Sequence, residues 1–279
     1  MNNAMPSLSI TPPYIDRASL LAAFNALLTP ERFTDYGPNG LQVEGKTQIR
    51  KIVSGVTASR ALIEAAIAAK ADAIFVHHGL FWRGQSGTVT GWMKQRLALL
   101  LAHDINLLAY HLPLDAHPEL GNNAQLGVKL GFLPGNLSGK TADGPEIKHF
   151  GEQSLGFMVN LADSGRRELE NGQNLQKHLE IYLNRPVTGV NVNYSAIKNV
   201  AWCTGGAQSY FEAAIAAGAD AFITGEISEP QAHLARECSV AYFACGHHAT
   251  ERYGAPAVAA HVAAQFGIEH EFIEIDNPA

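Results

Sequence analysis

The sequence predicts an α/β protein made of two similar lobes, and two observations support this fold class. The first is an internal repeat: residues 49–78 align without a gap on residues 197–226. The second is that apolar runs suited to strands alternate with helical patterns in both copies, which is typical of largely parallel sheets flanked by helices. A repeated α/β unit implies two lobes that face each other, and the residues after each copy predict a metal site between them.

The first half of the chain predicts its elements in a regular order. A helix is expected over residues 16–28, because the proline at position 30 cannot continue it. Residues 35–45 are dense in turn formers and predict a loop. The first copy then predicts strands at 49–56, 73–76 and 105–110, with helices at 59–70 and 90–103.

The second half repeats this order after a connecting segment. Residues 133–195 are richer in Gly, Pro and Asn, and predict a strand at 154–161 and a helix near 174–183. The second copy predicts strands at 197–203, 221–224 and 240–245, with helices at 209–217 and 230–238. A helix at 256–265 and a strand at 270–275 are expected to return to the first lobe. The expected lobes are residues 1–130 with 252–279, and residues 131–251.

Composition and charge narrow the class of protein. The chain has 279 residues and a net charge of −6, which argues against a sequence-independent grip on nucleic acid phosphates. No apolar stretch approaches about 18 residues, so no membrane span is expected. Residues 1–7 lack the pattern of a signal peptide, and three scattered cysteines do not form a disulfide framework. We therefore expect a soluble cytoplasmic protein.

Histidines and carboxylates follow the predicted strands in both copies. They form three groups, namely His77-His78, His111 with Asp115, and His247-His248 with Glu251. Ligands collect at the carboxyl ends of parallel strands, so these groups should meet. Imidazole together with carboxylate suits Zn, Fe, Mn, Co or Ni rather than Ca or Mg. The pattern predicts two divalent transition-metal ions per chain, with Glu251 as the bridging carboxylate.

Three further residues are candidates for roles around this centre. His111 and Glu226 could each act as a ligand, as a proton shuttle, or as a partner that orients a ligand, and His248 could act as a general acid. The alternative is that each is a satisfied polar residue near a strand end. The glycine-containing loop at residues 204–209 could hold a phosphate, but a tight turn between strand and helix is the favoured explanation.

The chain resembles the GTP cyclohydrolase 1 type 2 family, also called the NIF-three-like proteins, in its short bacterial form. The matching stretches are residues 35–45, 76–82, 110–123, 222–226 and 245–252. The resemblance implies a dinuclear metal centre between two α/β lobes, a homohexameric ring, and conversion of GTP to a ring-opened or formylated pterin precursor. Carried over onto this sequence, it implies the metal ligands His77, His78, Asp115, His247 and Glu251.

Two functional hypotheses follow from these observations. The first is a metal-dependent hydrolase that opens a purine-nucleotide ring or cleaves a phosphoester, because two metal ions lower the pKa of water toward about 7. The alternative is a non-catalytic metal-binding or regulatory protein that acts through a partner, which the lack of an obvious phosphate or base motif favours. A ring that encircles DNA is disfavoured by the acidic charge.

Overall fold

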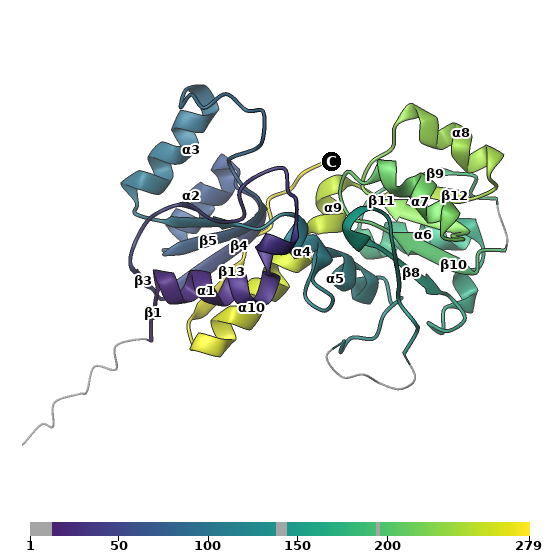
Figure 1. The fold of residues 1–279 in the computed structure, drawn as a ribbon, viewed down its shortest axis with the longest axis horizontal. Helices are drawn as coiled ribbons and strands as arrows, with labels where there is room; N and C mark the ends of the chain where they lie inside the picture. The colour runs from purple at the N-terminus through teal and green to yellow at the C-terminus, as the bar shows by residue number, and fades with distance from the viewer. Residues whose placement is uncertain (1–12, 138–143, 194–195) are drawn as a thin grey trace, which may run out of the picture.

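The computed structural model describes residues 13–137, 144–193 and 196–279. Residues 1–7, where we expect no signal peptide, lie outside the described part. Two α/β halves stand side by side, with three short helices between them (Figure 1). None of the described helices combines the length and the apolar character that a membrane span needs.

The first half is built on a five-stranded sheet in the order β13-β4-β5-β6-β2. Its strands are β2 (Gly40–Val43), β4 (Lys51–Thr57), β5 (Ala73–His78), β6 (Asn106–Ala109) and β13 (Glu269–Phe272). The first four strands of that order run parallel, and β2 is antiparallel to β6. Strand β13 pairs with β4, so the C-terminal segment lies at the edge of this first sheet. A short antiparallel pair, β1 (Ile15–Asp16) with β3 (Gln48–Ile49), lies beside it.

The expectation of a loop over residues 35–45 is wrong for its second part, where strand β2 forms. The turn formers occupy the first part of that stretch, and the strand begins at Gly40, whose φ is +105°. Val43 is buried among the side chains of one face of the sheet, and Leu41 packs against the other. Residues two apart on a regular strand share a face, but the register shifts between Leu41 and Val43, and the two side chains pack on opposite faces of the sheet. This packing makes a strand of a segment whose composition predicts a loop.

Helices cover both faces of the first sheet. They are α1 (Arg17–Leu28) and α10 (Gly254–Phe266) on one face, and α2 (Arg60–Ala68) and α3 (Gly91–Ala102) on the other. Phe24 of α1 stacks on Phe75 of β5, with ring centroids 4.5 Å apart. Ile74 and Val76 point into the opposite cluster. Because both faces are buried, the central strands are mostly apolar, as their sequence predicts.

The second half carries a six-stranded sheet in the order β7-β8-β10-β11-β12-β9. Its strands are β7 (Lys148–Phe150), β8 (Gly156–Asn160), β9 (Thr188–Val190), β10 (Asn199–Trp202), β11 (Ala221–Thr224) and β12 (Ala241–Ala244). The repeat copy supplies the parallel centre, β10, β11 and β12. The three strands from the connecting segment pair antiparallel, so this sheet is less parallel than expected.

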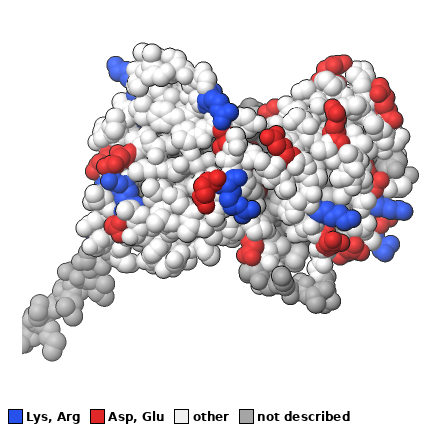
Figure 2. Space-filling model, in the orientation of Figure 1, with Lys and Arg blue, Asp and Glu red and all other residues white. Residues whose placement is uncertain are grey.

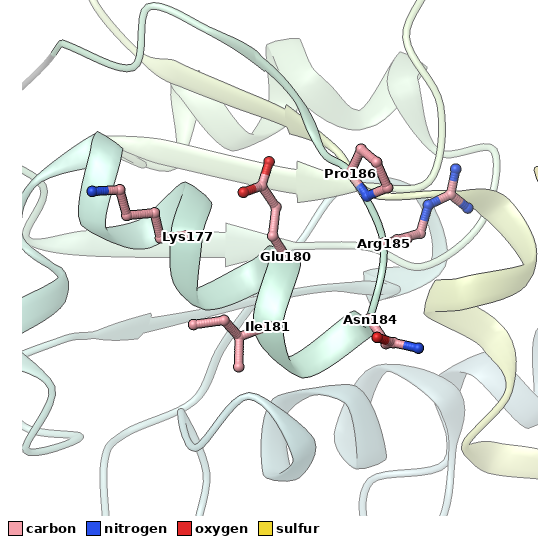
Figure 3. Close-up of a pocket in the computed structure, with 6 residues that line it drawn as sticks. All are labelled: Lys177, Glu180, Ile181, Asn184, Arg185 and Pro186. Atoms are coloured by element: carbon pink, nitrogen blue, oxygen red, sulfur yellow. The ribbon is translucent and has the colours of Figure 1, made fainter.

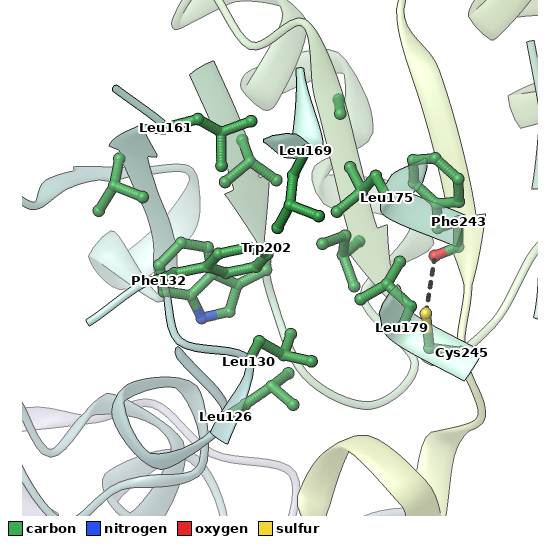
Figure 4. Packing of buried hydrophobic residues seen from close by; sticks show 14 of the residues in the cluster. Leu126, Leu130, Phe132, Leu161, Leu169, Leu175, Leu179, Trp202, Phe243 and Cys245 are labelled. Atoms are coloured by element: carbon green, nitrogen blue, oxygen red, sulfur yellow. Dashed lines mark hydrogen bonds between the residues drawn. The ribbon is translucent and has the colours of Figure 1, made fainter. Parts of the chain in front are cut away.

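The helices of the second half pack on the two faces of its sheet. They are α6 (Gly172–Leu183), α7 (Phe211–Ala216) and α8 (Glu229–Glu237). The core under α6 contains Trp202 and Phe132 among leucines (Figure 4), and the Trp202 indole N–H donates to the carbonyl of Asn123 at 2.8 Å. The thiol of Cys245 donates to the carbonyl of Phe243 at 3.8 Å, so this cysteine is a buried packing residue.

The remaining helices are short. Three lie between the halves, namely α4 (Leu112–Ala116), α5 (Asn122–Lys129) and α9 (His247–Glu251). The 3₁₀ helices are η1 (Pro30–Arg32), η2 (Glu152–Ser154), η3 (Arg167–Leu169) and η4 (Gln208–Tyr210). Because α4 and α9 consist of only five residues each, the sequence pattern does not reveal them.

The C-terminal segment crosses from the first half to the second. After β13, Arg185 donates from its two Nη atoms to the carbonyls of Pro278 and Ala279, each at 2.8 Å. The backbone N–H of His248 donates to the carbonyl of Ala279 at 3.2 Å. On the face shown in Figure 2, basic and acidic side chains are interspersed over a mostly uncharged surface.

Candidate metal centre

The centre is formed by residues from both halves of the chain. His77 and His78 are the last two residues of β5, rather than following a shorter strand as expected. On a regular strand two neighbouring side chains point to opposite faces. Here both rings converge: the Nε2 atom of His77 lies 3.3 Å from Oε1 of Glu251, and that of His78 lies 3.2 Å from Oε2.

Helix α9 brings the second half of the chain to the same place. His247 and Glu251 are its first and last residues, one helical turn apart, so their side chains share a face. The Nε2 atom of His247 lies 3.2 Å from Oε2 of Glu251. One oxygen of Glu251 therefore faces His77, and the other faces His78 and His247.

Helix α4 contributes a second carboxylate. Asp115 lies on α4, and His111 caps its N-terminal end. The Oδ1 atom of Asp115 is 3.5 Å from Nε2 of His77. The ligand atoms of His111, His77 and His78 all lie within 4.8 Å of one another. The structure therefore brings His111 to the edge of the cluster as well as Asp115.

The partners of the Nδ1 atoms fix how the histidine rings are oriented. Nδ1 of His77 lies 3.1 Å from the carbonyl oxygen of Tyr110, which can only accept, so this nitrogen carries the proton. Nδ1 of His247 lies 2.6 Å from Glu226, and Nδ1 of His111 lies 2.7 Å from Asp35. With the protons on Nδ1, the Nε2 lone pairs of His77 and His247 are directed at Glu251, as in histidines that bind a metal.

This arrangement fits a cation. The Nε2 atom of His77 and the Oε2 atom of Glu251 are buried and have no hydrogen-bond partner. Imidazole lone pairs that face carboxylate oxygens repel unless a positive charge lies between them. Within the described residues, three sets of donors lie close enough to share an ion: His77 with Asp115 and Glu251, His78 with His247 and Glu251, and His77 with His78 and His111.

In the metal-free protein, protons take part of the role of that cation. Burial alone would lower the pKa of His77, but the carboxylates of Asp115 and Glu251 outweigh it and raise the pKa to about 9. The pKa of His247 is raised to about 9 in the same way, against burial, by Glu251 and Glu226. Burial lowers the pKa of His78 to about 3. A metal ion therefore competes with protons for this cluster.

Polar residues that the sequence analysis did not single out hold the carboxylates in place. The Asn122 amide donates to Oδ1 of Asp115 at 2.9 Å, and the Thr204 hydroxyl donates to the same atom at 3.2 Å. Asn122 also accepts from the backbone N–H of Gly254. The pair of asparagines within the matching stretch 110–123 was the available signal for this role, because buried amides need partners.

Gly205 lies against the bridging position. Its φ is +70°, and a Cβ built on it would lie 1.9 Å from Oε1 of Glu251. The loop at residues 204–209 therefore needs glycine both for its backbone and to leave room for a carboxylate. The tight-turn explanation accounts for this glycine, and the structure adds the contact with Glu251.

The three additional candidates have different positions. Glu226 accepts from Nδ1 of His247, so it orients a ring of the cluster. His111 is oriented by Asp35, which also accepts from the backbone N–H of Leu112 at 2.9 Å. The ring of His248 points away from the cluster, and its Nε2 atom pairs with Glu274 at 2.5 Å. The stretch with Asp35 was expected to be only a connection, and the structure corrects this.

A cavity of about 170 Å³ opens beside the cluster. His111, Asp115, His247 and Glu251 line one side of it, and Tyr36 and Tyr210 come from different halves of the chain. A larger groove of about 540 Å³ runs along α6 (Figure 3). Its described lining residues include Lys177, Glu180 and Arg185 but no histidine, so of these two hollows only the smaller one offers metal-ligand side chains.

Comparisons of this chain with known proteins all point to one protein family. A family model described as Duf34/NIF3 (NGG1p interacting factor 3) matches residues 15–278. A Neisseria meningitidis serogroup A protein described as a GTP cyclohydrolase 1 type 2 homolog is 48% identical over 264 residues, covering 94% of this chain and 99% of that protein. A Pseudomonas aeruginosa protein of the same description is 46% identical over 262 residues, covering 94% and 98%. A solved structure of the protein ybgI, described as of unknown function, is 41% identical with a TM-score of 0.84, covering 95% of this chain and 100% of that chain.

Proposed function

The chain belongs to the Duf34/NIF3 family, and from this membership and the geometry of the site we propose that it is a dinuclear metal-dependent hydrolase. The observation that carries the proposal is the set of Nε2 lone pairs directed at two buried carboxylates. His77 and Glu251 leave buried atoms without a hydrogen-bond partner there, and a cation between them would satisfy both.

We assign two divalent transition-metal ions to the two donor sets that share Glu251. His77 and Asp115 would hold one ion, and His78 and His247 the other. Glu251 would bridge them, because its two oxygens face different histidines. The mixture of imidazole and carboxylate suits Zn, Fe, Mn, Co or Ni.

When bound, such ions supply Lewis acidity and hydroxide at neutral pH. The protein's own residues would bind and orient the substrate and move a proton. His111 is placed to hold a proton on Nδ1 against Asp35, which would leave its Nε2 atom free, and one of its ring nitrogens lies within 4.8 Å of the ligand atoms of His77 and His78. Asp35 is fixed in turn by Asn39, whose amide donates to its Oδ2 atom at 2.9 Å. A hydrolysis of a cyclic amidine or amide bond, or of a phosphoester, is compatible with this arrangement.

The test is metal content, measured by plasma mass spectrometry on the purified protein and on a His247→Ala, Glu251→Ala double variant. We expect about two transition-metal ions per chain in the unmodified protein and a loss of both in the variant. The His233→Ala, Glu229→Ala variant is a matched control, because this exposed pair has the same four-residue spacing on α8. No bound metal after reconstitution would contradict the proposal.

A non-catalytic metal-binding protein is the second candidate. The burial of Asp115 and Glu251, which are 6% and 2% exposed, favours it, because structural metal sites are closed. The two candidates differ in exchangeable water on the ions. Water-proton relaxation of the manganese-loaded protein distinguishes them, since a closed site shows little enhancement. We also propose, from the family resemblance, that the chain forms a homohexameric ring, which light scattering tests.

A further inference from the structure

We infer that the cavity beside the metal cluster receives a small, uncharged, planar ring and not the phosphates of a nucleotide. The inference rests on the proposed function for the place where the ligand reacts, and it names the class of substrate. Three features of the cavity support it: its charge, its aromatic side chains and its size.

The first feature is the lack of positive charge in the cavity wall. None of the described residues that line it is Lys or Arg, whereas three are carboxylates, namely Asp115, Glu152 and Glu251. Phosphate sites in proteins use Arg, Lys or helix N-termini to balance the charge. Together with Glu152, Asp115 and Glu251 would balance three of the four positive charges of two divalent ions, and the one that remains is fewer than the negative charges that a polyphosphate carries.

The available guanidinium lies elsewhere. Arg83 lines a separate groove that shares Tyr36 with the cavity. Its Nη2 atom donates to the carbonyl of Asp35 at 2.7 Å, and its backbone N–H donates to the carbonyl of Tyr36. Arg83 therefore fastens one loop to another, and it makes no contribution to the lining of the cavity.

The second feature is aromatic. The ring of Tyr36 is 60% exposed although it lines a cavity and has its edge toward His111, at 5.9 Å between ring centroids. Tyr210 lines the same cavity from the second half, and its hydroxyl donates to the carbonyl of Glu152 at 3.1 Å. The hydroxyl of Tyr210 is thereby occupied, so an aromatic ring in the wall is what this residue offers to a ligand, and Tyr36 supplies a second ring from the other half.

The third feature is size and neutral polarity. A cavity of about 170 Å³ is smaller than the roughly 300–1,000 Å³ of sites for larger ligands. The amide of Gln153 is engaged by the backbone of Thr34, at 2.9 Å and 3.3 Å, which ties the two halves together over the cavity. The Ser209 hydroxyl is a neutral hydrogen-bonding group in the wall. A ring that carries its own amide or amidine groups fits these surroundings.

The experiment compares inosine with inosine 5′-monophosphate by isothermal titration calorimetry on the full chain loaded with zinc. These probes share a neutral fused ring and differ in one phosphate. We expect inosine to bind at least as tightly as its monophosphate, with little dependence on ionic strength. Tyr36→Leu should weaken inosine binding about tenfold, because stacking on an aromatic ring contributes about 1–3 kcal/mol per base. The matched control is Tyr182→Leu, which replaces an exposed tyrosine of α6 and should leave the affinity for inosine unchanged.

Three outcomes would overturn the inference. They are a monophosphate that binds more than about tenfold tighter than inosine, an inosine affinity unchanged by Tyr36→Leu, and an absence of binding by inosine. If inosine 5′-monophosphate binds tighter than inosine and Arg83→Ala removes this difference in affinity, the phosphate binds in the groove of Arg83. Metal-dependent cleavage of a phosphoester without ring binding would sink this inference and leave the proposed hydrolase intact. Binding of inosine by a protein that takes up no metal would support this inference and contradict the proposed hydrolase.

Discussion

Gly205 shows how a single residue can determine whether the metal centre forms. We predict that Gly205→Ala loses most of its bound metal, because the added Cβ would displace Oε1 of Glu251. Gly218→Ala is the matched control, since Gly218 also has a positive φ, of +90°, but has nothing within 4 Å of its Cβ. Both variants should lose about 1 kcal/mol of stability from the backbone strain. Equal metal content in the two variants would contradict this reading of the contact.

His178 should make the stability of the protein depend on pH. Burial lowers the pKa of His178 below 6.5, and the neighbouring Arg166 lowers it further. Its Nε2–H donates to the carbonyl of Leu130 at 2.8 Å. Because the unfolded chain then binds a proton that the folded chain does not, stability falls as pH drops below about 6.5.

We therefore predict that His178→Gln flattens the loss of stability between roughly pH 7 and pH 5. Urea unfolding of the metal-free protein at a series of pH values measures how the free energy of unfolding depends on pH. The exposed His103 provides the comparison, and His103→Gln should leave the slope as it is. A slope that is the same in all three proteins would assign the acid sensitivity to other groups.

At the residue scale, the sequence predicted the histidines and carboxylates of the cluster more completely than the groups that hold them. Metal-ligand residue types stand out because they follow strands in both copies of the repeat. Thr204 comes from a segment that contacts the site only in the folded chain, so no local pattern marks it, and the one local mark of Asn122 is that it stands in a pair of asparagines. His248 was included for its position beside His247, but successive residues on a helix face different directions, and its ring turns away.

Helix α9 is the element on which the alignment of His247 with Glu251 depends. The Thr250 hydroxyl accepts from the backbone N–H of Gly205 at 3.0 Å and donates back to the carbonyl of Gly246 at 2.9 Å. We predict that Thr250→Val costs about 1–3 kcal/mol, because it leaves a buried N–H unpaired. It should also weaken zinc binding, measured by competition with a chromophoric chelator. Thr188→Val, on the exposed edge of β9, should cost less than half as much and bind zinc normally.

Elements of regular length were predictable, and short ones were not. The repeat located the parallel strands of both sheets, because their apolar runs are bounded by helices with a clear period. The α/β fold class is confirmed by the structure and by its solved relatives. The sequence pattern did not predict four short elements, because each is too short to show a clear period. They are the three-residue strands β7 and β9 and the five-residue helices α4 and α9.

For the whole molecule, the centre should act as a clamp between the halves. His77 and Asp115 come from the first half, whereas His247 lies after β12 of the second. We predict that removing metal with dipicolinate lowers the melting temperature by several degrees, since a ligand at 100 times its Kd stabilises the folded state by about 2.7 kcal/mol. Calorimetry with and without added zinc measures the shift, and hydrogen exchange should become faster in α4 and α9. An unchanged melting temperature would show that the halves are held together by their packing alone.

The two donor sets differ in burial, and this difference sets an order of exchange. His77, Asp115 and Glu251 are all buried, whereas His78 and His247 retain partly accessible side chains. A chelator should therefore extract metal in two phases, the outer ion leaving first while the inner one persists. A protein caught between the phases and supplied with a second element would become heterobimetallic, with cobalt or manganese in the outer position reporting spectroscopically on whatever enters the cavity.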